Sequence, residues 1–276
     1  MSERERADTA LVRKGLAASR EKAQAMIMAG EVYIGERKIN KPSESIKPGD
    51  EFSIRSEKDR YVSRGAYKLE KAVRVFSQDL KGRVIMDIGA STGGFTDVCL
   101  RNGAAHVYSI DVGYGQLDWK LRNDPRVTVM ERTNARYLTA DMFPSLPDLT
   151  VMDVSFISIR LIIPKAFEIM GNQGRMITLI KPQFEAGRDK IGKKGVVRNA
   201  DVHEEVLEGI VRFCETSGLH VNGLDYSPIT GPEGNIEFLA EIAPKAPGDT
   251  MIDRTFIRSL VSQAHEKLYH SDSTQE

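Results

Sequence analysis

Residues 83–97 read Arg-Val-Ile-Met-Asp-Ile-Gly-Ala-Ser-Thr-Gly-Gly-Phe-Thr-Asp. This stretch predicts an apolar strand, a glycine-rich turn and then a helix. In open α/β folds such a turn lies at the carboxyl edge of the sheet, where backbone N–H groups and a helix N-terminus bind ligands. A dinucleotide fingerprint needs glycine where Ser91 stands, so that the backbone can approach a pyrophosphate. A dehydrogenase is therefore disfavoured.

The same turn carries an acid, Asp87, two residues before its first glycine. The pattern D-x-G-x-S-x-G resembles the cofactor loop of S-adenosylmethionine methyltransferases, whose ligand has no pyrophosphate. An ordinary tight strand-to-helix turn has similar glycines and stays an alternative. The resemblance implies that the cofactor meets Asp87, Gly89, Ala90, Ser91, Gly93, Gly94 and Phe95.

Strands and helices alternate after residue 66, which predicts a doubly wound, mostly parallel sheet of Rossmann-like type. We expect strands at 84–88, 106–111, 127–130, 149–153 and 176–180, with helices at 66–76, 94–101, 116–121, 159–169 and 202–216. Strands near 220–226 and 235–242 have no helix between them, so they should form an antiparallel pair at one edge. The predicted domains are 1–60, a linker over 61–65, the α/β domain over 66–245, and a C-terminal helix with a polar, disordered tail over 246–276.

Composition excludes several classes of protein. The 276 residues are 41% apolar, enough for a core, but no apolar run approaches the 18–20 residues or so of a membrane helix. The charged start has no signal-peptide pattern. Cys99 and Cys214 have neither disulfide nor zinc spacing, and we expect buried free thiols, no metal, and a cytoplasmic protein. The net charge of +0 means that a polyanion must be met by local patches. The oligomeric state is not indicated.

Residues 1–60 predict a small α+β module of two helices and short strands, with Ser19 capping the second helix and Gly30 ending it. The order Leu11-Val-Arg-Lys-Gly-Leu-Ala-Ala-Ser-Arg-Glu-Lys, followed by Met28-Ala-Gly-Glu-Val-Tyr-Ile-Gly, closely resembles the S4 RNA-binding domain over residues 7–54. From charge alone, a solvated face is the favoured interpretation of the basic cluster. The S4 resemblance implies RNA contacts by Arg13, Lys14, Ser19, Arg20, Lys22, Arg37 and Lys38.

Two positions beyond the glycine turn suit a nucleoside. Asp111 ends the second strand, 24 residues after Asp87, which is about where a Rossmann-like site places an acid on a ribose diol. It could instead cap the next helix. With its neighbour Val112, and with Asn134 after the third strand, it should line the cofactor site. Asn134 could pair with an adenine edge or simply make a turn.

Four charged residues occupy chemically suggestive places. Lys68 lies on the helix before the first strand, Asp153 and Lys181 close two strands at the same sheet edge, and Glu237 interrupts the last strand. A structural ion pair and two surface charges would be the simpler interpretation. However, this Lys-Asp-Lys-Glu set resembles the tetrad of FtsJ-like ribose 2′-O-methyltransferases. We expect Lys181 to be the base and Asp153 to place it, with Lys68 and Glu237 orienting and tuning them.

The whole chain resembles the TlyA-type rRNA methyltransferases, a family historically labelled haemolysins, most specifically at Asp153-Val-Ser-Phe-Ile-Ser and Lys181-Pro-Gln-Phe-Glu. The resemblance implies S-adenosylmethionine as cofactor and cytidine riboses of 16S or 23S rRNA, in ribosomal subunits, as targets. Two alternatives are a non-catalytic, RNA-binding ribosome assembly factor and, with little support, a membrane-lytic protein. Sequence does not settle which lysine is the base, because either needs a lowered pKa near neutral pH.

Further basic residues surround these segments. Arg60 ends the first module and Arg64 lies in the linker. A glycine-rich basic stretch over 181–199, which suits a mobile loop over RNA, contains Arg188, Lys193 and Lys194. A solvated loop explains that stretch equally well. Phe156, beside Asp153, suits base stacking.

Overall fold

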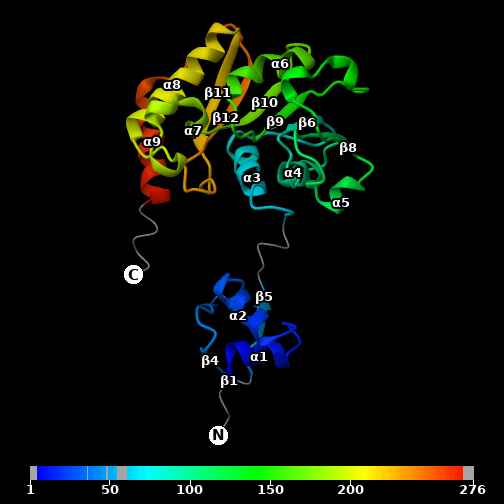
Figure 1. The fold of residues 1–276 in the computed structure, drawn as a ribbon, viewed down its shortest axis with the longest axis vertical. Helices are drawn as coiled ribbons and strands as arrows, with labels where there is room; N and C mark the ends of the chain where they lie inside the picture. Colours follow the sequence, from blue (N-terminus) through cyan, green and yellow to red (C-terminus); the bar gives the residue numbers. More distant parts are fainter. Residues whose placement is uncertain (1–4, 36, 48, 55–60, 270–276) are drawn as a thin grey trace. The chain divides into compact units, whose positions relative to one another are not determined.

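The computed structural model describes residues 5–35, 37–47, 49–54 and 61–269. Two compact units divide the chain, Met1–Tyr61 and Val62–Glu276 (Figure 1). Residues 62–65 differ from the expected linker because they belong to the second unit, where the Val62 N–H donates to Asp97 Oδ2 at 3.0 Å. Arg60 and the C-terminal tail over 270–276 lie outside the described residues.

The first unit packs two helices against short antiparallel strands. Ser19 caps the second helix by accepting the Lys22 N–H at 3.2 Å, and Gly30 follows that helix with φ +75°. A small core of buried side chains, including Leu11, Ile27 and Ile39, joins the helices to the strands. The elements are β1 (Glu5–Arg6) paired with β4 (Ser45–Ile46), the sheet β3-β2-β5 (Arg37–Lys38, Val32–Ile34, Phe52–Ile54), α1 (Ala7–Arg13) and α2 (Arg20–Met28).

A buried carboxylate ties this unit together. Asp8 is fully buried and accepts hydrogen bonds from Arg6, the Thr9 N–H, Arg20 and Gln24. The Arg6 guanidinium above all holds the pKa of Asp8 far below its usual range. A buried charge is costly without partners, and these donors offset that cost. Arg20, expected to meet RNA, therefore also supports the fold.

In the second unit, seven described strands form one sheet in the order β11-β12-β10-β9-β6-β7-β8. The strands from β10 to β8 run parallel, and β12 pairs antiparallel with both β10 and β11, which confirms the doubly wound sheet with an antiparallel edge. The strands are β6 (Val84–Ile88), β7 (His106–Ile110), β8 (Val127–Met130), β9 (Leu149–Met152), β10 (Arg175–Ile180), β11 (Leu219–Tyr226) and β12 (Phe238–Pro244).

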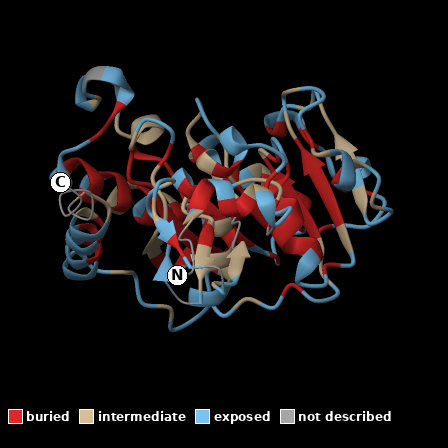
Figure 2. Ribbon diagram, turned by 90° about the horizontal axis from the view of Figure 1, so that it is seen from below, coloured by how far each residue is buried: buried red, intermediate tan, exposed pale blue. Residues whose placement is uncertain are grey.

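Helices pack around this sheet and bury its strands (Figure 2). Side chains of α6, α8 and α9 share one apolar cluster with the sheet, among them Phe167, Leu207 and Ile257. The C-terminal helix is thus part of the core, since its apolar stripe faces inward. The helices are α3 (Ala66–Val75), α4 (Gly94–Arg101), α5 (Trp119–Arg122), α6 (Ile163–Ile169), α7 (Pro182–Glu185), α8 (Ala200–Thr216) and α9 (Arg254–Tyr269), with 3-10 turns η2 (Ala135–Tyr137), η3 (Ala140–Met142), η4 (Ile159–Leu161), η5 (Arg188–Lys190) and η6 (Lys193–Gly195).

Two helix predictions need correction. The helix expected over 159–169 is split into η4 and α6, because Pro164 has no N–H and fits only the first turn of a helix. The helix expected over 116–121 begins at Trp119, where Asp118 caps it by accepting the Lys120 N–H at 2.8 Å. Cys99 and Cys214 are buried free thiols, as expected. Within the described residues, no helix has the length and apolar character needed to span a bilayer.

Candidate active site

The glycine turn is shaped by close packing. Gly89 has φ +83°, and a Cβ there would lie 2.5 Å from the carbonyl oxygen of Asp153. Gly93 has φ +96°, and a Cβ there would lie 2.3 Å from Leu121 Cδ1. Only glycine fits both positions. The turn after β6 therefore packs directly against Asp153, the residue that follows β9.

Two cavities adjoin at this sheet edge. The smaller, about 250 Å³, is lined by Lys68, Asp153, Lys181 and Glu237 together with the glycine turn. The larger, about 430 Å³, lies along the ends of β6 and β7 and includes Asp111. Both are lined by Gly89, Ser91, Asp153 and Ser155. A molecule in one cavity can therefore touch a molecule in the other.

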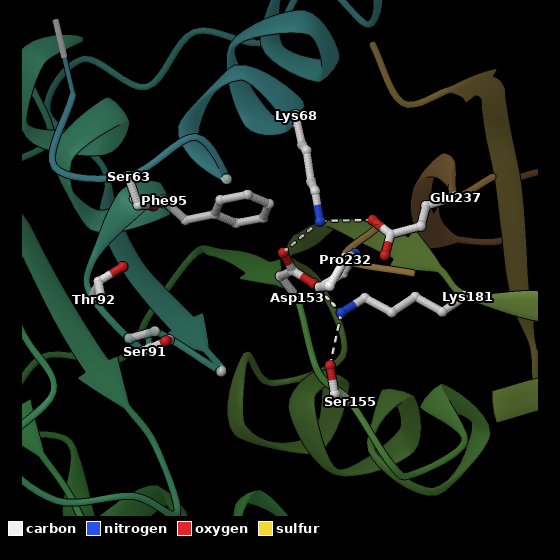
Figure 3. A pocket seen from close by; sticks show the side chains of 14 residues that line it. Ser63, Lys68, Ser91, Thr92, Phe95, Asp153, Ser155, Lys181, Pro232 and Glu237 are labelled. Carbon is white, nitrogen blue, oxygen red and sulfur yellow. Dashed lines mark hydrogen bonds and ion pairs between the residues drawn. The ribbon is translucent and has the colours of Figure 1, made fainter. Parts of the chain in front are cut away.

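The four predicted catalytic residues converge in the smaller cavity (Figure 3). Lys68 Nζ lies 2.6 Å from Glu237 Oε2 and 3.2 Å from Asp153 Oδ2. Lys181 Nζ lies 2.5 Å from Asp153 Oδ1 and donates to Ser155 Oγ at 2.9 Å. Glu237 stands immediately before β12 rather than inside it, which corrects the predicted strand. One carboxylate, Asp153, thus joins the two lysines.

Burial and charge act on these groups in opposite directions. Burial alone lowers the pKa of Lys68, but the carboxylates of Asp153 and Glu237 outweigh it, so the pKa of Lys68 is raised. Burial raises the pKa of Asp153, but the ammonium groups of Lys181 and Lys68 outweigh it and lower that pKa. Lys68 therefore stays protonated and Asp153 stays ionised at neutral pH.

Asp111 faces the larger cavity and also fixes its wall. Its carboxylate accepts the Ser91 N–H at 2.8 Å and the Gly113 N–H at 2.7 Å, which ties the glycine turn to the end of β7. It is not the cap of the following helix, because Asp118 has that role. Each carboxylate oxygen has a second lone pair left for a ligand hydroxyl.

Other predicted cofactor residues divide among the two cavities and the interior. Val112 and Asn134 line the larger cavity, although Asn134 Oδ1 also accepts the Arg136 N–H at 3.0 Å in the turn chemistry considered as its alternative. Ala90, Gly94 and Phe95 line the smaller one. Asp87 and Gly93 line neither. Asp87 is fully buried and accepts a hydrogen bond from the Thr96 hydroxyl at 2.7 Å. It therefore supports the glycine turn from the interior of the protein and does not face either cavity.

Sequence reasoning missed several lining residues. Ser63 and Thr92 line the smaller cavity, as does Pro232 from the segment before β12. Ser155 lines both cavities and contacts Lys181 directly. Its place two residues after Asp153 was a usable signal. No sequence pattern indicates Ser63 or Pro232, because these residues reach the cavity only through the packing of distant segments.

The predicted RNA contacts are exposed but partly engaged. Arg13 pairs with Glu5, Arg37 with Glu44, and the Lys14 ammonium donates to the Asp50 carbonyl. The segment over 181–199 is not one long loop, since it contains α7, η5 and η6 and buries Val196 and Val197. Ser19, Lys22, Lys38, Arg64 and Lys194 are exposed, while the side chains of Arg188 and Lys193 are outside the description.

Comparisons with known proteins agree with this geometry. Family models for an FtsJ-like methyltransferase and an S4 domain match residues 61–242 and 5–52. The Bacillus subtilis protein YqxC is 47% identical over 270 residues, 97% of this chain and 96% of the relative. Mycobacterium tuberculosis TlyA, named a 16S/23S rRNA (cytidine-2'-O)-methyltransferase, is 43% identical over 239 residues, 86% of this chain and 89% of the relative. A solved Streptococcus thermophilus structure, which carries the name hemolysin, is 46% identical with a TM-score of 0.76, covering 99% of this chain and 100% of that one.

S-adenosylmethionine is the cofactor, and the larger cavity fits it. The Asp111 carboxylate suits a ribose diol, and the apolar side chains of Ile110, Val112 and Ile162 suit an adenine ring. Asp153 lies at the junction of the cavities, where its negative charge would suit a sulfonium. Gly89, Ser91, Asp111, Val112 and Asn134 line this cavity, and we propose that they would hold the cofactor.

Replacing Asp111 with alanine tests the ribose contact. Asp111→Ala should weaken S-adenosylmethionine binding by about 1–3 kcal/mol, because ligand hydroxyls and the two backbone N–H groups lose their acceptor. Isothermal titration calorimetry measures this change. Asp118→Ala, which removes a helix cap of the same chemistry, is the matched control and should bind normally. Equal cofactor affinity in both variants would show that Asp111 does not contact the cofactor.

Asp87 should make folding stability depend on pH. Burial raises the pKa of Asp87 to about 7, although the Thr96 hydroxyl opposes this. Because this folded-state pKa exceeds the ordinary value of 3.8, the folded protein holds the proton more tightly. Its contribution to stability is therefore lost as pH rises from about 4 to about 7.

Melting temperatures of the wild type and Asp87→Asn, measured across that pH range, isolate this contribution. The wild type should lose stability relative to the variant as the pH rises. Asp141→Asn changes an exposed carboxylate and should leave the pH profile of the wild type unaltered. A constant difference between wild type and Asp87→Asn at every pH would contradict the prediction.

Proposed function

We propose that this chain, which belongs to the TlyA group of the FtsJ-like methyltransferase family, transfers a methyl group from S-adenosylmethionine to a ribose 2′-hydroxyl of ribosomal RNA. The observation that carries the proposal is the set formed by buried Lys68, Lys181 and Glu237 with half-buried Asp153, in the cavity next to the cofactor cavity. S-adenosylmethionine supplies an electrophilic methyl group. The protein must then supply a base and hold the ribose oxygen in line with that methyl.

Lys181 is the proposed base. Its ammonium group must first release a proton to water. The neutral amine then takes the proton from the ribose O2′–H as the O–CH3 bond forms, and the C–S bond breaks with its electron pair kept by sulfur. Asp153 lines both cavities and lies 2.5 Å from the Lys181 amine, which lines the smaller one. The proton therefore has an acceptor beside the place where the methyl group crosses.

Lys68 is less suited to that task. Its ammonium is held by two carboxylates, Asp153 and Glu237, and its pKa is raised. A lysine that stays charged donates hydrogen bonds but does not accept a proton. We therefore assign Lys68 and Glu237 to orienting Asp153 and to stabilising negative charge that develops on the ribose oxygen.

Ribosomal RNA is the proposed substrate on two grounds. The S4 domain supports binding to structured RNA, and the relative TlyA is named for cytidine 2′-O-methylation of 16S and 23S rRNA. We extend the cytidine specificity and both rRNA targets to this chain, which would act on ribosomal subunits in the cytoplasm. The smaller cavity, about 250 Å³, has room for one ribose but not for a stacked run of nucleotides.

Radiolabelled methyl transfer to 30S and 50S subunits from a strain that lacks the gene tests the proposal. The modified nucleotide is then identified by mass spectrometry of rRNA fragments as a 2′-O-methylcytidine. Methylation on a base atom would contradict the ribose assignment. RNA binding without any methyl transfer would instead favour the non-catalytic assembly factor.

Two substitutions of Lys181 separate catalysis from structure. Lys181→Ala should lower the single-turnover rate by about 10²- to 10⁴-fold, and Lys181→Arg nearly as much, because guanidinium does not release its proton near neutral pH. S-adenosylmethionine affinity should change little in either. Lys165→Ala, which breaks the surface pair with Glu168, is the control and should keep the full rate. An active Lys181→Arg enzyme would show that the residue is only an ion-pair partner.

A further inference from the structure

We infer that Ser155 is a positioning residue that, with Asp153, fixes the direction of the Lys181 amine toward the ribose oxygen. This inference rests on the proposed function, because it explains how the proposed base is aimed. Ser155 is not one of the four charged residues of the tetrad. It is the neutral group that the structure places against Lys181 (Figure 3).

The two contacts of the Lys181 amine differ in kind. Its Nζ lies 2.5 Å from Asp153 Oδ1, but among the described residues that oxygen accepts no hydrogen bond, so the ion pair sets a distance rather than a direction. The same nitrogen donates a hydrogen bond to Ser155 Oγ at 2.9 Å, and a hydrogen bond does fix the direction of an N–H group. Within the described part of the chain, Ser155 is therefore the residue that orients this nitrogen, which belongs to a side chain lining the smaller cavity. A lysine held by Asp153 alone could rotate about a single contact.

Ser155 lies where the cofactor cavity and the substrate cavity meet. Ser155 lines both cavities, as Asp153 does, so Lys181 is held by two residues that stand where the cofactor and substrate spaces meet. Ser155 is also exposed, although Lys181 is buried with 7% exposure. The hydroxyl thus reaches from the cavity wall to the amine and holds the amine beside the residues that line both cavities.

A second network holds the segment that carries Ser155. The Glu185 carboxylate, at the end of α7, accepts the Ser158 hydroxyl at 2.7 Å and the Ile159 N–H at 2.8 Å. Because α7 begins directly after Lys181, these two hydrogen bonds connect the segment that contains Ser155 to the segment that contains Lys181. Phe156 has φ +66°, so the backbone reverses sharply beside Ser155. Ser155 is therefore presented by an anchored turn.

The neutral hydroxyl also suits a base better than a second carboxylate. Glu237 and Asp153 together keep Lys68 charged, whereas Lys181 has one carboxylate and one hydroxyl. A hydroxyl accepts an N–H and sets its direction without adding a full negative charge that holds the proton. The two lysines of the site thus differ in their partners rather than in residue type.

A double-mutant cycle on the full-length protein tests the inference, with methyl transfer to unmodified 30S and 50S subunits as the assay. Ser155→Ala should lower the single-turnover rate by about 10- to 100-fold, as for a misaimed reacting group, with unchanged affinity for S-adenosylmethionine and an unchanged melting temperature. Ser155→Cys, a weaker acceptor of similar shape, should lose part of the rate. Ser259→Ala on α9 is the matched control and should keep it.

The decisive comparison uses the Lys181→Ala background. If Ser155 acts through Lys181, adding Ser155→Ala to Lys181→Ala should cause no further loss. An equal fold-loss in both backgrounds, full activity of Ser155→Ala, or a loss confined to cofactor affinity would each overturn the inference. Full activity of Lys181→Ala would instead refute the proposed base. Full activity of Ser155→Ala beside an inactive Lys181→Ala would refute the role of Ser155 alone.

Discussion

The Asp153 carboxylate between two ammonium groups is the constraint that the active site depends on. Lys68 and Lys181 are both buried, and a buried charge without a partner costs several kcal/mol. Asp153 contacts both lysines and Glu237 contacts one, so two positive and two negative charges balance in one small volume. Removing Asp153 alone would leave two ammonium groups with one carboxylate. The position of Asp153 therefore determines where α3, β10 and the segment before β12 must lie.

Sheet topology supplies those positions. β9 and β10 are parallel neighbours, so Asp153 and Lys181, which follow them, emerge at the same edge. β12 runs antiparallel to β10 with Phe238 opposite Ile180, and the residue before β12 therefore lies beside the residue after β10. Glu237 and Lys181 are adjacent for this reason. An antiparallel strand added to a parallel sheet thus delivers its first residues, not its last, to the ligand-binding edge.

This arrangement explains what the sequence could predict. Strand ends are readable from apolar runs that stop at a charged residue, so Asp111, Asp153 and Lys181 were placed correctly at one edge. The alternation of Glu237 with Ile236 and Phe238 predicts that Glu237 lies inside a strand. The Asn235 side chain instead accepts the Val197 N–H and donates to the Gly195 carbonyl, and the strand begins only at Phe238. Asp87 lies in the glycine motif, but its burial behind the turn depends on Thr96, nine residues later. The Asp8 cluster likewise joins residues from two helices.

The largest gap between sequence and structure concerns the two lysines, because residue type cannot distinguish them. Their difference arises only in three dimensions, where one ammonium has two carboxylate partners and the other has a carboxylate and a hydroxyl. A quartet that only stabilised the fold would gain from pairing both lysines fully, since each unpaired N–H in a buried site costs free energy. The site leaves Lys181 with fewer carboxylate partners, next to Asp153, which lines the cofactor cavity. That asymmetry is unfavourable for packing alone and is what the proposed proton transfer to Lys181 requires.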